Sequence, residues 1–390
     1  MALNSNQSWH KAYYILLVIL LVALMQPSGG TWAFIHDIRW LYVFLVSFII
    51  TQLLTPIVIK LAFYFKILDY PDARKIHGHP IPRLGGLAIV ASILIATARN
   101  LQFSPQLLGL TVGCALIYLI GLIDDVHPLP ATPRFIAQIV ICLMIIKSDV
   151  VLTVFPQTWL FAKYVNVALT LLWFVGIANA INFLDGVDGL ATGMIALCAL
   201  LFFSIAWPTR QSYLSYITIA TAGACIGFLP YNWRPAKVFL GDAGATFLGF
   251  LIAGLAVMGS WAHKDPAVAL STPLLILGIP IFDMIYITVS RIKNDLVHNV
   301  KEWLEYTGRD HFHHRLMHLG LSQVQTVLFI WMLNLCLGLG ALVIRDTGIR
   351  GSMLLLIQSV IIFVIVIVLM ILGKDATNKP DIKWKSTDIY

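Results

Sequence analysis

The stretch KYVNVALTLLWFVGIANAINFLDGVDGL, Lys163–Leu190, decides how this chain is organised. It begins as an apolar run long enough to cross a bilayer. Its second half carries four polar residues at every third position: Asn179, Asn182, Asp185 and Asp188. A helical backbone places such residues roughly on one face, and they are costly beside hydrocarbon unless something needs them. Oxygen ligands next to glycines suit a hard cation such as Mg²⁺, particularly one that carries phosphates; a polar membrane-surface turn with helix caps is the alternative.

The composition places the chain in a membrane. Of its 390 residues 59% are hydrophobic and only 12% are charged, and the mean hydropathy is +0.85. Apolar runs of roughly 20 residues, enough for a helix to cross a bilayer, recur along the chain. A transmembrane barrel would show short alternating strands instead. We therefore expect an all-α polytopic membrane protein, with the net charge of +7 reporting on topology and anionic substrates and with no nucleic acid as a partner.

We expect eleven or twelve transmembrane helices with cytoplasmic catalytic loops. The expected spans lie near residues 40–65, 84–98, 107–123, 134–155, 163–182, 189–207, 212–229, 245–262, 268–290, 324–345 and 352–373. A further run, Ala12–Met25, is short for a span. We interpret it as an extra helix rather than a signal peptide, because no small-residue cleavage site follows it. All five cysteines fall within apolar runs, which indicates buried thiols and no disulfide framework.

Lysines and arginines outside the spans gather on one side of the expected membrane, which the positive-inside rule makes cytoplasmic. The same side receives nearly all of the polar clusters, so we expect the working face there. We divide the chain into an N-terminal extension at 1–39 with the extra helix, an integral-membrane domain at 40–373, and a polar cytoplasmic tail at 374–390. No internal repeat or low-complexity segment is visible.

A pair of carboxylates, Asp124 and Asp125, ends one expected span. Adjacent carboxylates repel each other unless a cation or a proton relieves them. Stopping a helix at the interface is the alternative role, but a single acid would be enough for that. We therefore take this pair as a candidate for function.

The segment Pro230–Gly244 joins two spans and contains a second candidate group. Asp242 stands between glycines just before an expected helix start, where a carboxylate can reach a metal while backbone N–H groups meet phosphate. Phe239 offers a stacking face for a base, and Asn232 offers a hydrogen-bonding edge. Helix capping by Asp242 is the alternative, but it does not account for the surrounding glycines.

Histidines His311, His313 and His314 lie in the longest expected cytoplasmic loop. No cysteine accompanies them, so binding of phosphate oxygens or proton transfer near neutral pH suits them better than a zinc site. A solvated polar loop is the alternative.

Two other positions complete the set of candidates. The first cytoplasmic loop carries several cations, including Lys75 and Arg83, which could hold a pyrophosphate or anionic headgroups, or reflect topology alone. Asp283 sits more than one turn inside its expected span, so we expect it to have a partner within the bundle. Hard-ion ligands and anion binders on one face together indicate Mg²⁺-assisted phosphoryl chemistry between a lipid and a cytosolic substrate.

These motifs resemble a known family. Four segments carry the resemblance: Asn179–Leu190, Asp124-Asp125, Phe239–Gly244 and His311–His314. They are similar, in order and from about Trp40 to Leu372, to the polyprenyl-phosphate N-acetylhexosamine-1-phosphate transferases, the glycosyltransferase 4 group that contains WecA, TagO and MraY. The His-x-His-His form and the Pro80–Gly86 run look more like the WecA and TagO branch. The eukaryotic dolichol enzymes carry arginines in place of these histidines, which favours a bacterial inner membrane.

The resemblance implies a role for each matched residue. Asn182 and Asp242 would hold Mg²⁺, or Mn²⁺, on the diphosphate, and Asp185 would support the metal or the sugar. Asp188, Asn232 and Phe239 would face the uracil. The diphosphate would be bound by His311, His313 and His314, and the lipid phosphate would lie by Asp124 and Asp125. The lysine that contacts uracil in some relatives has no secure match, because His79 falls near its place, so Lys75 is assigned by position only.

The resemblance implies transfer of a sugar 1-phosphate, GlcNAc-1-phosphate in the first instance, from a UDP-sugar to undecaprenyl or decaprenyl phosphate. UMP would be released, and a cell-envelope polysaccharide such as cell wall, lipopolysaccharide O-antigen or teichoic acid would be initiated. UDP-FucNAc, UDP-QuiNAc and the MurNAc-pentapeptide nucleotide stay open as donors, and a homodimer stays open as the assembly. A transporter is the alternative from another class, although transporters place such groups near the midplane and often show paired repeats.

Overall fold

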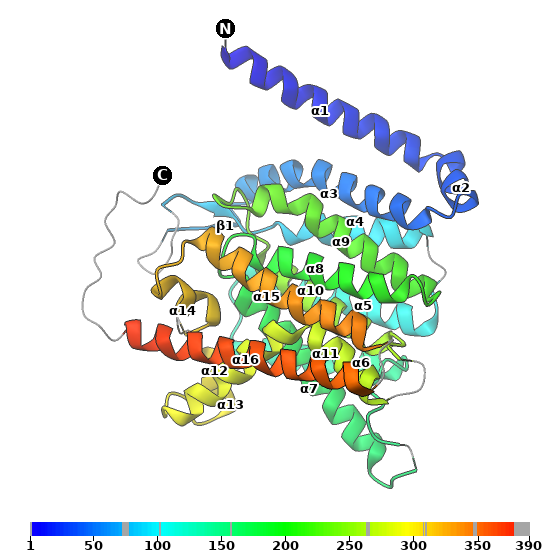
Figure 1. The fold of residues 1–390 in the computed structure, drawn as a ribbon. Coiled ribbons are helices and arrows are strands. Elements are labelled where there is room, and N and C mark those ends of the chain that lie inside the picture. The colour runs from blue at the N-terminus through cyan, green and yellow to red at the C-terminus, as the bar shows by residue number, and fades with distance from the viewer. Residues whose placement is uncertain are drawn as a thin grey trace.

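The computed structural model describes residues 2–71, 78–100, 103–156, 158–262, 266–306, 308, 310–345 and 349–377, and it confirms the all-α class (Figure 1). Within this part of the chain the only strands are β1 (Leu68–Asp69) and β2 (Ile81–Pro82), which pair antiparallel. The helices are α1 (Ala2–Met25), α2 (Pro27–Ile35), α3 (Arg39–Tyr64), α4 (Gly86–Asn100), α5 (Pro105–Val126), α6 (Ala131–Lys147), α7 (Ala162–Leu184), α8 (Leu190–Ala206), α9 (Ser212–Asn232), α10 (Gly241–Met258), α11 (Pro266–Ile276), α12 (Gly278–Lys293), α13 (Val300–Glu305), α14 (Phe312–His318), α15 (Gln323–Ile344) and α16 (Ile349–Thr377).

Every predicted span is helical, but the helices differ in length from the expectation. Among the described residues, seven are long and apolar enough to cross a bilayer alone, namely α3, α5, α7, α9, α10, α15 and the Met353–Leu372 part of α16. Two bent pairs, α1 with α2 and α11 with α12, raise this number to nine. The predicted eleven or twelve is reached only with α4, α6 and α8, whose 15, 17 and 17 residues are short for a bilayer core of about 30 Å. The span predicted near 134–155 ends at Lys147.

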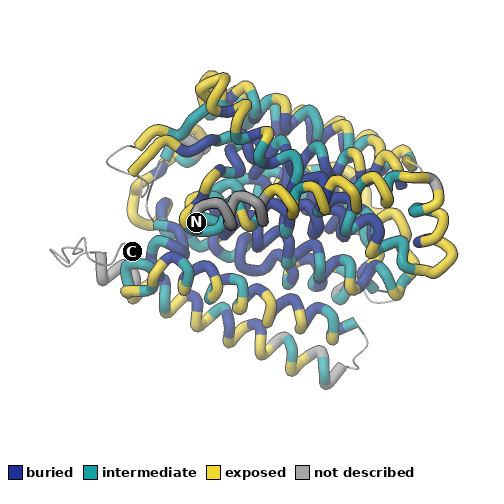
Figure 2. The backbone as a smooth tube through the Cα atoms, turned by 90° about the horizontal axis from the view of Figure 1, so that it is seen from above, coloured by how far each residue is buried: buried dark blue, intermediate teal, exposed yellow. Residues whose placement is uncertain are grey.

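Helix α10 lies in the middle of the bundle and is buried along nearly its whole length. Small residues allow this, because they let neighbouring backbones approach closely. A Cβ atom on Gly244 would lie 2.7 Å from the Cα of Gly86 in α4, and one on Gly249 would lie 2.6 Å from the Cα of Ala178 in α7. Figure 2 shows the buried residues in the middle of the bundle and the exposed ones along its outer helices. The N-terminus of α10 is thereby held against α4 and α7.

The polar elements gather at one end of the bundle. In Figure 1, β1, α13, α14 and the C-terminal end of α16 lie at this end, and α2 lies at the opposite end. Helix α1 runs along the outside of the bundle beside α3. The predicted gathering of polar loops on one side is therefore reproduced by the fold.

The structure corrects the prediction of one continuous span near 268–290, because two helices lie there with a sharp bend between them. Helices α11 and α12 meet at an angle of 80° around Leu277. A break exposes backbone groups that apolar surroundings cannot satisfy. The buried side chain of Asn334 in α15 satisfies two of them: its Nδ2 donates to Ile276 O at 3.0 Å, and its Oδ1 accepts from Ile279 N at 3.3 Å.

We expect the Asn334→Ala variant to unfold at a lower temperature than the wild type. Two buried backbone groups would lose their partner, at a cost of about 1–3 kcal/mol. Thermal unfolding of the detergent-solubilised protein measures the difference. Met332→Ala is the matched control on the same helix, because Met332 is exposed and should leave the midpoint unchanged. Equal midpoints for Asn334→Ala and Met332→Ala would contradict the role of the amide at the break.

Candidate active site

Three chain segments meet at the N-terminus of α10. Gly85 N donates to Phe239 O at 3.0 Å and Phe239 N donates to Pro82 O at 2.8 Å, so the end of the α3–α4 loop runs beside the approach to α10. The C-terminal turn of α5 supplies Asp125, whose two carboxylate oxygens accept from the backbone N–H groups of Asp242 and Ala243, both at 3.1 Å. A carboxylate at a helix N-terminus satisfies free N–H groups and the helix dipole. Asp125 therefore fixes the position from which Asp242 projects.

Arg83 links these segments electrostatically. Its Nη2 lies 3.4 Å from Asp242 Oδ2 and 3.7 Å from Asp125 Oδ1, and its Nη1 lies 3.6 Å from Asp69 Oδ1. Burial lowers the pKa of Arg83, but these three carboxylates together with Asp185 outweigh that effect and raise it above its ordinary value. One permanent cation thus faces several carboxylates.

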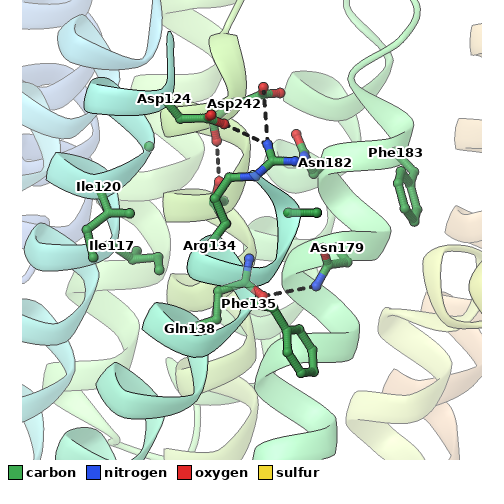
Figure 3. Close-up of a pocket in the computed structure, with 13 residues that line it drawn as sticks. Ile117, Ile120, Asp124, Arg134, Phe135, Gln138, Asn179, Asn182, Phe183 and Asp242 are labelled. Carbon is green, nitrogen blue, oxygen red and sulfur yellow. Dashed lines mark hydrogen bonds and ion pairs between the residues drawn. The ribbon is translucent and has the colours of Figure 1, made fainter. Parts of the chain in front are cut away.

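A pocket beside Asp242 has a polar end and an apolar end (Figure 3). Its polar end contains Asp124, Arg134, Asn182 and Asp242, which Figure 3 shows gathered around the Arg134 guanidinium. Arg134 Nη1 donates to Asp124 Oδ2 at 2.6 Å and lies 3.9 Å from Asp242 Oδ2. The other oxygen of the buried Asp124 carboxylate accepts from Leu129 N at 2.7 Å.

The deeper wall of the pocket is largely apolar. It contains Ile117 and Ile120 from α5 and Phe135 from α6. A hydrogen bond from Asn179 Nδ2 to Gln138 Oε1, 3.1 Å long, joins α7 to α6 beside them. The pocket thus combines a charged end with a largely apolar wall.

Arg134 is a residue that sequence reasoning missed. It is not among the candidate residues named from the sequence, yet it joins Asp124 to Asp242. The available signal was its place near the start of the helix that follows the Asp124-Asp125 pair. Gln138, one turn further along the same helix, would have been found in the same way.

Asp185 caps the C-terminus of α7 and lies among like charges. Burial raises the pKa of Asp185 well above its ordinary value, and the negative charges of Asp242, Asp125 and Asp188 raise it further, against the lowering effect of Arg83. Carboxylates that oppose one another's ionisation are relieved when a cation binds between them.

The predicted uracil-facing residues have structural partners of their own. Asn232 is buried: its Oδ1 accepts from Gly189 N at 3.2 Å and from Thr192 Oγ1 at 2.9 Å, and its Nδ2 donates to Val238 O at 3.0 Å. Asp188 Oδ2 accepts from Ala236 N at 3.1 Å. These bonds tie the α9–α10 loop to the turn between α7 and α8, where Gly189 has a φ of +76° that favours glycine. In this structure the side chain of Asn232 thus holds the α9–α10 loop against the α7–α8 turn. The predicted uracil contacts of Asn232 and of the half-buried Phe239 stay predictions.

The histidine loop packs against the same turn. The His311 ring centroid lies 4.8 Å from that of Phe183, and a Cβ atom on Gly186 would lie 3.5 Å from His313 Nε2. The rings of His313 and His314 are 4.3 Å apart. Burial lowers the pKa of His313 well below its ordinary value, so that His313 is neutral at neutral pH. Lys75 lies outside the described residues, so its predicted role stays a prediction.

The donor set suits Mg²⁺. Asn182 and Asp242 line one pocket, with Asp185 close enough to Asp242 for their charges to interact. In the part of the chain that the structure describes, no three His, Cys, Asp or Glu side chains converge enough to hold a metal by themselves. The amide of Asn182 and the carboxylate of Asp242 fit Mg²⁺, which uses one or two carboxylates and leaves the other positions to water and substrate phosphates.

Comparison with known proteins identifies the family of this chain. The family model for glycosyl transferase family 4 matches residues 107–260. A probable undecaprenyl-phosphate N-acetylglucosaminyl 1-phosphate transferase of Bacillus subtilis is 32% identical over 342 residues, which cover 86% of this chain and 92% of that protein. A decaprenyl-phosphate N-acetylglucosaminephosphotransferase of Mycolicibacterium smegmatis is 31% identical over 378 residues, covering 86% and 90%. A phospho-N-acetylmuramoyl-pentapeptide-transferase of Staphylococcus carnosus is 32% identical over 242 residues, covering 55% and 74%. The chain therefore belongs to glycosyl transferase family 4, among the polyprenyl-phosphate N-acetylhexosamine-1-phosphate transferases.

Proposed function

We propose that this protein transfers GlcNAc-1-phosphate from UDP-GlcNAc to undecaprenyl or decaprenyl phosphate and releases UMP. The observation that carries the proposal is the pocket in which Asp124, Arg134, Asn182 and Asp242 form a charged end above an apolar wall. A polyprenyl phosphate has the matching form, with an anionic head on an apolar chain. The relatives named for GlcNAc transfer cover more of this chain than the one named for the MurNAc-pentapeptide, which favours GlcNAc.

The acceptor phosphate would lie at the Arg134 end of the pocket, with its chain along Ile117, Ile120 and Phe135. A guanidinium is well suited to phosphate because it offers several N–H donors in one plane. Asp124 holds Arg134 in place through their 2.6 Å contact. Arg134 is therefore assigned to binding and orientation of the acceptor.

The donor would lie between the α7–α8 turn and the histidine loop. Asn182 and Asp242 would hold Mg²⁺ there, and the ion would neutralise charge on the diphosphate. Neutral His313, next to Gly186, has a ring nitrogen able to donate to a diphosphate oxygen. Asp188 and Phe239, at the loop tied to that turn, are assigned to the uracil.

We favour direct attack by the acceptor. An oxygen of the lipid phosphate forms a bond to the β-phosphorus of the UDP-sugar, and the bond from that phosphorus to the bridging oxygen breaks, with UMP leaving. The second pKa of a phosphate monoester is about 6, so most of the acceptor is already a dianion at neutral pH. Asp124 and Asp125 are engaged with Arg134 and with the α10 N–H groups, which supports a positioning role for them.

We place the reaction at the cytoplasmic face of a bacterial inner membrane, where UDP-sugars are available, as the first step of a cell-envelope polysaccharide. The positive-inside distribution of lysines and arginines supports this orientation.

The test uses membranes from cells that express the chain, supplied with undecaprenyl phosphate, Mg²⁺ and a panel of UDP-sugars. We expect UMP and a lipid-linked diphospho-sugar from UDP-GlcNAc, and neither in the presence of a chelator. A faster reaction with UDP-FucNAc, UDP-QuiNAc or the MurNAc-pentapeptide nucleotide would change the donor. Failure of every donor, or solute uptake without UMP release, would overturn the proposal.

We expect the Arg134→Ala variant to raise KM for the lipid phosphate, with little change in KM for the UDP-sugar. A lost hydrogen bond to a charged group is worth about 1.5–3 kcal/mol, or roughly 10- to 150-fold in kcat/KM. Arg134→Lys should recover part of the loss because it keeps the charge. A rise confined to the KM of the UDP-sugar would contradict the assignment of this pocket to the acceptor.

A further inference from the structure

A buried ionic network lies beneath the histidine loop. Asp283, which is buried inside α12, accepts from His311 Nδ1 at 3.0 Å and from Phe312 N at 2.9 Å. The partner that the sequence predicted for Asp283 is therefore the first histidine of the loop. One carboxylate fixes both the His311 ring and the backbone that begins α14.

The other side of His311 faces a cation. Arg291, one of the most deeply buried side chains, binds Asp310 through two hydrogen bonds of 2.8 Å. Its Nη2 lies 3.5 Å from His311 Nε2, and its guanidinium lies 4.5 Å from the ring centre of Tyr306. Burial alone would raise the pKa of Asp310, but the hydrogen bonds and charge of Arg291 outweigh it and hold that pKa below its ordinary value.

These contacts select one tautomer of His311. A guanidinium can only donate, so the His311 Nε2 that faces it must present its lone pair. Asp283 can only accept when it is ionised, so His311 Nδ1 must carry the hydrogen. The His311 ring is thus held in a fixed plane, with Nδ1 on Asp283 and Nε2 toward Arg291.

His313 differs from His311 in this respect. It is almost completely buried, and neither of its ring nitrogens has a hydrogen-bond partner among the described residues. The two rings are nearly parallel, at 7°, with centroids 5.8 Å apart. The His311 ring thus lies parallel to the His313 ring, which in turn lies beside Gly186.

We propose that Asp283 is a positioning residue for the transfer reaction: by fixing the tautomer and plane of His311, it holds His313 against the Asp185–Gly186 turn. The proposal rests on the proposed function, with His313 as the group that meets the donor and His311 as its support. Carboxylates that orient functional histidines in this way are worth roughly 10- to 100-fold when removed.

The test compares Asp283→Asn with Asp283→Glu in detergent-solubilised full-length protein. Asparagine keeps the size and still accepts from Phe312 N, but its NH₂ group cannot accept from His311 Nδ1. We expect Asp283→Asn to lower kcat by about 10- to 100-fold, with KM for the lipid phosphate unchanged, and Asp283→Glu to recover part of the loss. Unchanged turnover in Asp283→Asn would overturn the proposal.

Thr288→Ala is the matched control. Thr288 lies on the same helix and accepts from Trp303 Nε1 at 3.1 Å, so it also holds the cytoplasmic loop but does not contact His311. Its turnover should stay within about twofold of wild type. A loss as large as that of Asp283→Asn would assign the effect to loop stability and would contradict a specific role for Asp283.

A double-mutant cycle with His311→Ala separates action through His311 from an independent effect. If Asp283 acts through His311, Asp283→Asn should cost almost nothing further in the His311→Ala background. Multiplicative losses would overturn the proposal.

A measurement that does not depend on turnover distinguishes failure of the positioning role of Asp283 from failure of the proposed function. ¹⁵N-histidine NMR of the wild type, assigned by loss of the signal in His311→Ala, should show the Nδ1–H tautomer at His311. An Nε2–H tautomer would overturn the positioning proposal even if GlcNAc-1-phosphate transfer is observed. Absence of transfer in the wild type, with the Nδ1–H tautomer present, would overturn the proposed function instead.

Discussion

Replacing Asp242 by asparagine is expected to reduce sugar-phosphate transfer by about 10³-fold or more. Asp242 lies at the N-terminus of α10 and lines the pocket with Asn182, the other assigned Mg²⁺ ligand. Neutralising charge in a phosphoryl-transfer site is worth several kcal/mol, and each 1.36 kcal/mol is tenfold in rate. Asparagine keeps the shape of the side chain, so the loss measures charge. Turnover is followed as UMP release over a range of Mg²⁺ concentrations.

The fold should survive this substitution. Asp125 binds the backbone N–H of residue 242 and that of Ala243, and neither bond involves the side chain that is changed. Thermal unfolding without added metal should therefore show no loss of stability. Asp295→Asn, the same change in an exposed loop at the same end of the molecule, is the matched control and should keep full activity. Undiminished turnover in Asp242→Asn would remove this residue from the metal site.

Helical periodicity and apolar length were sufficient to locate the membrane-embedded helices. Each predicted span except the one near 268–290 coincides with a single helix, because hydrocarbon leaves the backbone no alternative within an apolar run. The break between α11 and α12 was not predictable in the same way. The run is continuously apolar there, and the bend depends on Asn334, which is distant in sequence and belongs to another helix. Tertiary partners of this kind leave no local signal.

The same limit applies to the site. The sequence placed Asp124, Asp125 and Asp242 at helix ends on one side, since each carboxylate adjoins the end of an apolar run. It did not indicate that Asp125 would cap α10, or that Arg134 would join Asp124 to Asp242. Those relations arise where α4, α5 and α10 pack closely through small residues, and they require the assembled bundle. The roles assigned to individual residues stay predictions until variants are measured.

Replacing Asp185 by asparagine is expected to lower turnover and, at the same time, to raise the stability of the metal-free protein. The raised pKa of Asp185 means that its charged form is disfavoured in the folded state. Stability is then lost as the pH rises from the ordinary carboxyl pKa, about 4, through the raised folded value, because the folded state binds the extra proton. The amide cannot ionise, so the variant escapes this loss.

The expected result is a difference in unfolding temperature that depends on pH and on metal. At neutral pH without metal, Asp185→Asn should unfold at a higher temperature than the wild type, and the gap should close as the pH falls toward about 4. Mg²⁺ should stabilise the wild type more than the variant, because a ligand that binds only the folded state raises its stability. If the variant is less stable than the wild type at neutral pH, then the favourable contacts of the Asp185 carboxylate outweigh its repulsion by Asp242. The charge repulsion at this turn would then no longer support the proposed binding of a divalent cation there.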